Sequence, residues 1–131
     1  MNLILALCSS LIILHTANGS IANQPHNHAT IASYVKPDEI NQGYLDESYR
    51  IYKHVIELDK RNEKMSDEFR TEFIDFSIQM RTENPSERIL AILLSRLYVR
   101  KMALEINSES GEDRRIFNET ISELRAVFHE D

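Results

Sequence analysis

The sequence predicts an all-α protein, a small four-helix up-down bundle that follows a disordered N-terminal leader. Two observations predict this fold. Apolar residues recur at steps of four, three and four in three separate windows, which is the spacing of one face of an amphipathic α-helix. No segment keeps the sustained alternation of apolar and polar residues that a half-buried strand requires.

Each window defines the apolar stripe of one helix. The stripes are Leu45, Tyr49, Tyr52 and Ile56; Phe69, Phe73, Phe76 and Met80; and Phe117, Ile121, Leu124 and Phe128. Between the second and third stripes, residues 89–106 are apolar around most of the helix circumference. We therefore expect that segment to be the central helix, covered by the other three.

Capping residues and prolines divide the chain into four helices, expected at residues 45–63, 67–83, 85–107 and 111–129. Asn84, Pro85 and Glu87 form the pattern of a capping box with proline at the first helical position. Ser66 and Ser110 stand at N-cap positions ahead of acidic residues, which favour the positive end of a helix dipole. The short connections favour antiparallel neighbours.

The N-terminus carries the pattern of a secretory signal. Residues 3–14 form an uncharged apolar run that is too short to span a bilayer but has the length of a signal-peptide core. Ala17 and Gly19 supply the small residues required before a cleavage site, so residues 1–19 are predicted to be removed ahead of Ser20. The alternatives are a signal anchor or a buried helix. We expect a secreted, extracellular protein with no membrane span after cleavage.

Residues 20–43 show no helical period and are interrupted by Pro25 and Pro37. They are predicted to be a flexible polar leader, with a short helical turn after Pro37, that is dispensable for the fold. Residues 44–131 are expected to form the helical domain.

Composition narrows the classes of function. The net charge is −6, and an acidic balance argues against nucleic acid as a partner. Three glycines exclude a glycine-rich phosphate loop. The one cysteine, Cys8, falls in the predicted signal peptide, which excludes a disulfide framework and a multi-cysteine zinc site. Carboxylates are dispersed on polar helix faces, so we expect no enzymatic activity, no metal and no cofactor.

Four basic residues stand out on the predicted third helix. They are Arg88, Arg96, Arg100 and Lys101, and we call them the basic stripe. This stripe could bind an anionic head group or an acidic partner, which makes an extracellular interaction module the leading hypothesis. The alternative is that these cations pair with carboxylates of neighbouring helices, each exposed pair contributing less than about 1 kcal/mol.

A second class of function is a carrier of a small, lipid-like apolar ligand in the helical core. The aromatic residues of the three stripes could line such a cavity, because bundle cores are a usual place for a ligand. The alternative is that these rings simply fill the core.

One modification signal lies in the fourth helix. Asn118, Glu119 and Thr120 form an N-glycosylation sequon without proline. Asn118 follows the core-facing Phe117 and is turned about 100° from it along a helix, so it is predicted to be exposed and available for a glycan.

Overall fold

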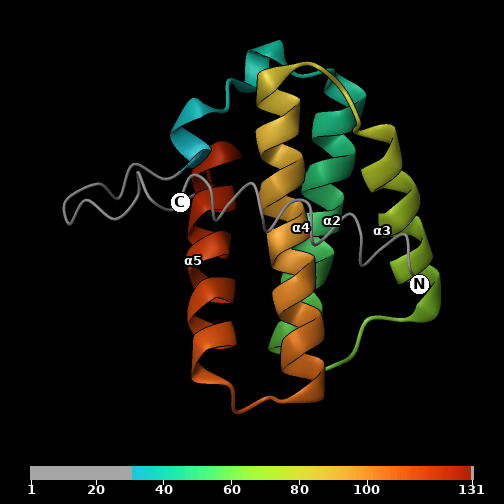
Figure 1. The fold of residues 1–131 in the computed structure, drawn as a ribbon, viewed down its shortest axis with the longest axis vertical. Helices are drawn as coiled ribbons and strands as arrows, with labels where there is room; N and C mark the ends of the chain where they lie inside the picture. Colours follow the sequence, from blue (N-terminus) through green and yellow to red (C-terminus); the bar gives the residue numbers. More distant parts are fainter. Residues whose placement is uncertain (1–30, 131) are drawn as a thin grey trace.

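The computed structural model describes residues 31–130, which form helices and turns and contain no strand. The elements are η1 (Ile31–Tyr34), η2 (Pro37–Glu39), α2 (Gln42–Lys60), α3 (Asp67–Gln79), α4 (Pro85–Ile106) and α5 (Gly111–Val127), where η marks a 3₁₀ turn. Successive α-helices run in opposite directions (Figure 1). The predicted all-α, four-helix up-down bundle is therefore confirmed. The predicted signal peptide, residues 1–19, lies outside the described residues.

Three helices begin at the N-caps that the sequence predicts. Side-chain oxygens of Ser66, Asn84 and Ser110 each accept a hydrogen bond from the backbone N–H three residues further on. These bonds satisfy N–H groups that have no partner within the helix. The starts of α3, α4 and α5 are thus determined by local sequence.

The start of α2 and the end of α3 differ from the prediction. Asn41 caps α2 by accepting from the Gly43 N–H at 2.9 Å, so the helix begins at Gln42 and not near residue 45. A Cβ on Gly43 would lie only 3.1 Å from the Asn41 Oδ1 atom, so glycine suits the first turn of this helix. At the other boundary, α3 ends at Gln79 and not near residue 83.

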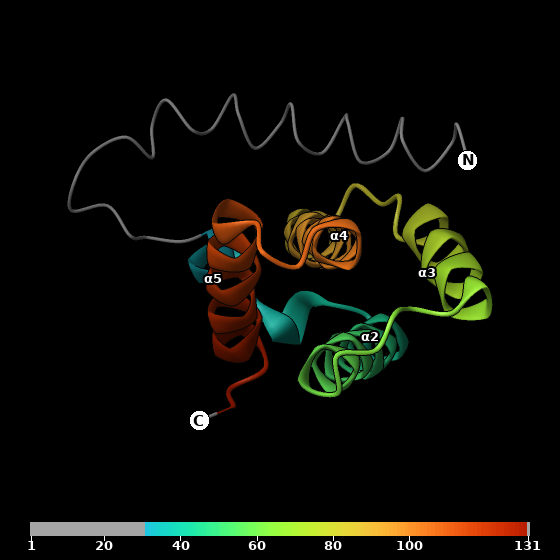
Figure 2. The ribbon, with the colours of Figure 1, turned by 90° about the horizontal axis from the view of Figure 1, so that it is seen from below.

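The central position of α4 agrees with the sequence. Leu90, Leu93 and Leu97 are each 0% exposed. Seen along the bundle, α4 lies between α5 and α3, and α2 runs along a third side (Figure 2). Burial of these leucines from several directions places one hydrophobic core around α4.

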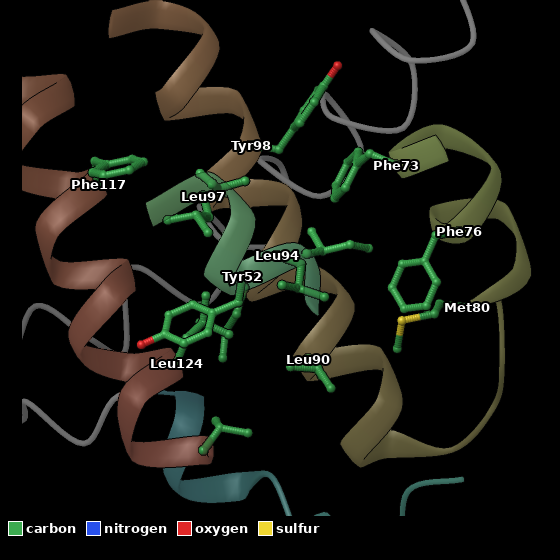
Figure 3. Close-up of a cluster of buried hydrophobic side chains, with 14 of the residues drawn as sticks. Tyr52, Phe73, Phe76, Met80, Leu90, Leu94, Leu97, Tyr98, Phe117 and Leu124 are labelled. Atoms are coloured by element: carbon green, nitrogen blue, oxygen red, sulfur yellow. The ribbon is translucent and has the colours of Figure 1, made fainter. Parts of the chain in front are cut away.

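Aromatic side chains hold α3 against the bundle. Phe73 of α3 stacks on Tyr98 of α4 with ring centroids 4.2 Å apart, and both rings point into the space between the two helices (Figure 3). Phe76 and Tyr44 of α2 form an edge-to-face pair with ring centroids 6.2 Å apart. Such aromatic pairs stabilise the packing of α3 beyond the apolar area that they bury.

The segment before α2 packs on the bundle, which corrects the prediction of a flexible leader for its second half. Residues 31–41, which we call the strap, cross the end of the bundle where α2 and α4 begin (Figure 1). Ala32, Val35 and Ile40 are buried, with 6–8% of their surface exposed. The strap therefore contributes apolar area to the core, while residues 20–30 of the predicted leader lie outside the described residues.

Backbone groups of the strap are bonded to the first turn of α4. The Lys36 N–H donates to Ser86 Oγ at 2.9 Å, and the Asn41 N–H donates to Glu87 Oε2 at 3.1 Å. Of the two hydrogen bonds of the predicted capping box, only the one from the Glu87 N–H to Asn84 forms. The Glu87 carboxylate instead accepts from the Asn41 N–H of the strap, and not from the N–H of its own N-cap residue. The strap thereby buries a carboxylate with its hydrogen bond satisfied.

We expect Leu93→Ala to lower the free energy of unfolding by about 2–5 kcal/mol, because it removes buried methyl groups and leaves a cavity. Urea denaturation followed by circular dichroism measures this loss. Ile106→Ala is the matched control in the same helix, since Ile106 is 87% exposed. Equal stability of the two variants would contradict the central position of α4.

We expect a chain that begins at Gly43 to be less stable than one that begins at Thr30, by about 2–4 kcal/mol. The shorter chain lacks the buried side chains Val35 and Ile40, each of which contributes roughly 1.5–3 kcal/mol before conformational entropy is subtracted. Thermal unfolding of both chains provides the measurement. Identical transitions would mean that the strap is not part of the folded domain.

Candidate functional site

Three of the four basic-stripe residues have partners within the fold. Arg88 is exposed near the start of α4, whereas Arg96 and Arg100 are partly covered and Lys101 is buried at 4% exposure. The pattern matches the alternative interpretation, in which these cations pair with neighbouring elements. The predicted stripe is therefore not a continuous exposed surface.

Arg96 joins α4 to α5 inside the bundle. Its guanidinium forms a salt bridge with Glu123, and the two side chains are only 14% and 9% exposed. The Nε atom also donates to Thr120 Oγ1 at 2.8 Å. Burial lowers the pKa of Arg96 to about 10, which still leaves it charged at neutral pH. The buried carboxylate of Glu123 therefore faces a cation.

Arg100 and Asp113 form a second link between α4 and α5. Arg100 Nη1 donates to Asp113 Oδ1 at 2.7 Å, and Ser110 Oγ donates to Asp113 Oδ2 at 2.7 Å. The bond from Arg100, followed by that from Ser110, holds the pKa of Asp113 below its usual value. This pair therefore stabilises the fold at neutral pH and loses that effect as the pH falls through the lowered pKa.

Lys101 fastens the connection between α2 and α3 to α4. Its ammonium group donates to the Glu63 carbonyl oxygen at 2.6 Å and lies 3.7 Å from Glu105 Oε2. Glu105 accepts from the Met65 N–H and from Arg70 Nη2, both at 2.7 Å. This network was not predicted from the sequence, although the spacing of four residues between Lys101 and Glu105 is a local signal for one of its pairs.

The outward side of α3 is acidic. Its exposed residues, which we call the α3 face, are Asp67, Glu68, Thr71, Glu72, Asp75, Ile78 and Gln79. The one cation of this helix, Arg70, is bonded to Glu105 of α4. Among the described residues of this face, only Glu72 has a basic partner, Arg50 of α2 at 3.1 Å. Sequence reasoning overlooked the face, although Asp67, Glu68, Glu72 and Asp75 outnumber the single arginine.

Helices α2 and α5 expose charges of both signs. On α2, Arg50 forms a salt bridge with Glu47 at 2.5 Å. On α5, Arg115 and Glu119 pair at 2.9 Å. Among the helices of residues 31–130, α3 is the one that exposes several charges of a single sign. Its field is therefore the least neutralised by neighbouring charges.

The aromatic side chains proposed as a ligand cavity contact one another. Phe128 lies 5.2 Å from Tyr52 and 5.1 Å from Tyr49, measured between ring centroids. Burial, and secondarily a hydrogen bond to Glu130, raises the pKa of Tyr52 to about 12, which keeps its hydroxyl neutral. These contacts favour the alternative in which the aromatic rings pack against one another and do not line a ligand cavity.

The sequon residues lie on different sides of α5. Asn118 is exposed, as predicted, whereas Thr120 is 0% exposed. Within the part of the chain that the structure describes, no three His, Cys, Asp or Glu side chains gather where they could hold a metal ion. No helix between residues 31 and 130 combines the length and apolarity needed to cross a bilayer.

Comparisons with known proteins add no functional assignment, because no family model, no curated protein and no solved structure matches the chain.

We expect Arg96→Leu to destabilise the protein by about 3–5 kcal/mol, because it leaves the Glu123 carboxylate buried without a cation. The double variant Arg96→Leu with Glu123→Leu should recover much of that loss, since both buried charges are then removed. Urea denaturation of the three proteins measures both effects. As a control, Arg115→Leu at an exposed pair should cost less than about 1 kcal/mol. A double variant no more stable than Arg96→Leu would contradict this assignment.

Proposed function

We propose that the protein is a secreted interaction module that binds a basic partner through the α3 face. The observation that carries this proposal is the exposure of four carboxylates on one helix, whose single cation, Arg70, is partly covered and paired with Glu105. Opposite charge on a partner would steer its approach to this face and determine its orientation there. Ile78, which is 39% exposed, adds an apolar contact at the end of the face.

The proposed partner surface is the α3 face and not the basic stripe, which the sequence had suggested. Arg96, Arg100 and Lys101 have carboxylate or carbonyl partners within the fold. Recruiting them to an external acidic partner would break these interactions and leave their partners unsatisfied. Glu68 and Asp75 of α3 carry no such cost, because they form no salt bridge shorter than 4.0 Å in the described residues.

Secretion rests on the N-terminal pattern of an uncharged apolar run followed by Ala17 and Gly19. An extracellular location also makes basic proteins and basic surface segments accessible to the α3 face. On this route the chain meets the enzymes that modify Asn-X-Ser/Thr sequons, so the proposal includes Asn118 as a glycan site.

We expect Thr71→benzoylphenylalanine, which places a photoreactive group on the α3 face, to cross-link a basic protein in extracellular fluid of the source organism. The yield should fall about tenfold when Glu68→Lys and Asp75→Lys are added, because two favourable charge pairs become repulsive. Gel electrophoresis quantifies the adduct, and mass spectrometry of the adduct gives the partner's sequence and hence its net charge.

The matched control reverses two exposed carboxylates elsewhere, Glu109→Lys and Glu112→Lys, which change the net charge by the same amount. This variant should keep the adduct. The proposal is refuted if both double variants lose the adduct equally, if the partner is acidic, or if Ser122→benzoylphenylalanine on α5 gives the same yield.

A further inference from the structure

The folded protein separates the two side chains that define its sequon. Asn118 points to solvent from α5, whereas Thr120, two residues later, is 0% exposed. The sequon requires a residue with a side-chain hydroxyl at its third position, here Thr120. This requirement indicates that the modifying enzyme must reach the hydroxyl. In the folded state that group lies between α4 and α5.

The hydroxyl of Thr120 is also fully engaged. It donates to the Ile116 carbonyl oxygen at 2.7 Å and accepts from Arg96 Nε at 2.8 Å. Arg96 is in turn held by its salt bridge with Glu123. Releasing the hydroxyl would therefore break the buried link between α4 and α5, which requires local unfolding.

We infer that Asn118 receives its glycan before α5 packs against α4, and that packing then closes the sequon. This inference rests on the secretory route in the proposed function and is independent of the α3 face. Modification and folding thus compete in time. Once the Arg96–Thr120 contact has formed, a chain without the glycan can no longer receive it unless it opens locally.

The chemistry is a transfer from a lipid pyrophosphate-linked oligosaccharide. The side-chain amide nitrogen of Asn118 attacks the anomeric carbon of the first sugar, and a nitrogen–carbon bond forms. The bond from that carbon to the pyrophosphate oxygen breaks, and the lipid pyrophosphate leaves with the electron pair. The amide nitrogen loses one proton to a base, and no atom is oxidised or reduced.

The glycan and the proposed partner surface occupy different sides of the molecule. Figure 2 shows α5 and α3 on opposite sides of α4. A glycan on the outer side of α5 would cover Asn118 and its exposed neighbours Arg115 and Ser122 while leaving the α3 face accessible. Modification and partner binding are therefore compatible in one folded protein.

The first experiment tests the site by translating the full chain in the presence of eukaryotic microsomes. A well-characterised cleavable signal replaces residues 1–19, so that translocation does not depend on the predicted signal. The wild-type chain and Thr120→Ser should each carry a glycan that peptide N-glycosidase removes. Asn118→Gln and Thr120→Val should carry none.

The second experiment tests the order of events with purified oligosaccharyltransferase and its lipid-linked donor. The folded, unmodified chain should accept the glycan at least about a hundredfold more slowly than Leu93→Ala/Leu97→Ala, since only opened molecules present the hydroxyl. That double variant keeps the sequon and loses a large enough share of the stability of a small domain to populate the unfolded state.

The outcomes are separable. A translocated wild-type chain without a glycan overturns the site, and equal rates for the folded chain and the unfolded variant overturn the order. Failure of the secretion proposal shows itself differently: the natural chain with residues 1–19 would then stay outside the microsomes and be digested by added protease. Translocation with loss of residues 1–19 supports the route on which the inference rests.

Discussion

The burial of α4 on several sides is the constraint on which the rest of the structure depends. A helix with apolar residues around its circumference must be covered by several neighbours. Leu90, Leu93 and Leu97 of α4 are 0% exposed. The neighbouring helices and the strap cover the apolar surface of α4. The same covering removes polar groups of α4 from water, so each of these groups needs a partner from a neighbouring element.

That requirement explains why three of the four basic-stripe residues support the fold. Arg96 and Arg100 reach α5, and Lys101 reaches the connection before α3. An unpaired buried charge would cost several kcal/mol. These pairs therefore disfavour arrangements in which α5 or that connection lies elsewhere, and they help to specify a single packing for helices whose apolar stripes are alike.

The use of these cations inside the bundle leaves the carboxylates of α3 with few neutralising partners, and the proposed partner surface follows from this. The α3 helix packs on the bundle through buried side chains such as Phe73, which stacks on Tyr98, and four of its carboxylates face outward. Across α4, helix α5 presents Asn118 to solvent. A protein of this size can thereby carry a glycan and a partner on different sides.

The sequence by itself determined the four helices, the N-caps of α3, α4 and α5, and the central position of α4, because helical periodicity and capping depend on residues within one or two turns of each other. Tertiary structure alone decided that Ala32, Val35 and Ile40 are buried, since they follow no period and the strap bonds to residues 46 and 50 positions away. The sequence likewise placed Arg96 on a helix face but not its partner. Only the packing of α5 brings Glu123 to it, because salt bridges between helices depend on how the helices pack and not on local spacing.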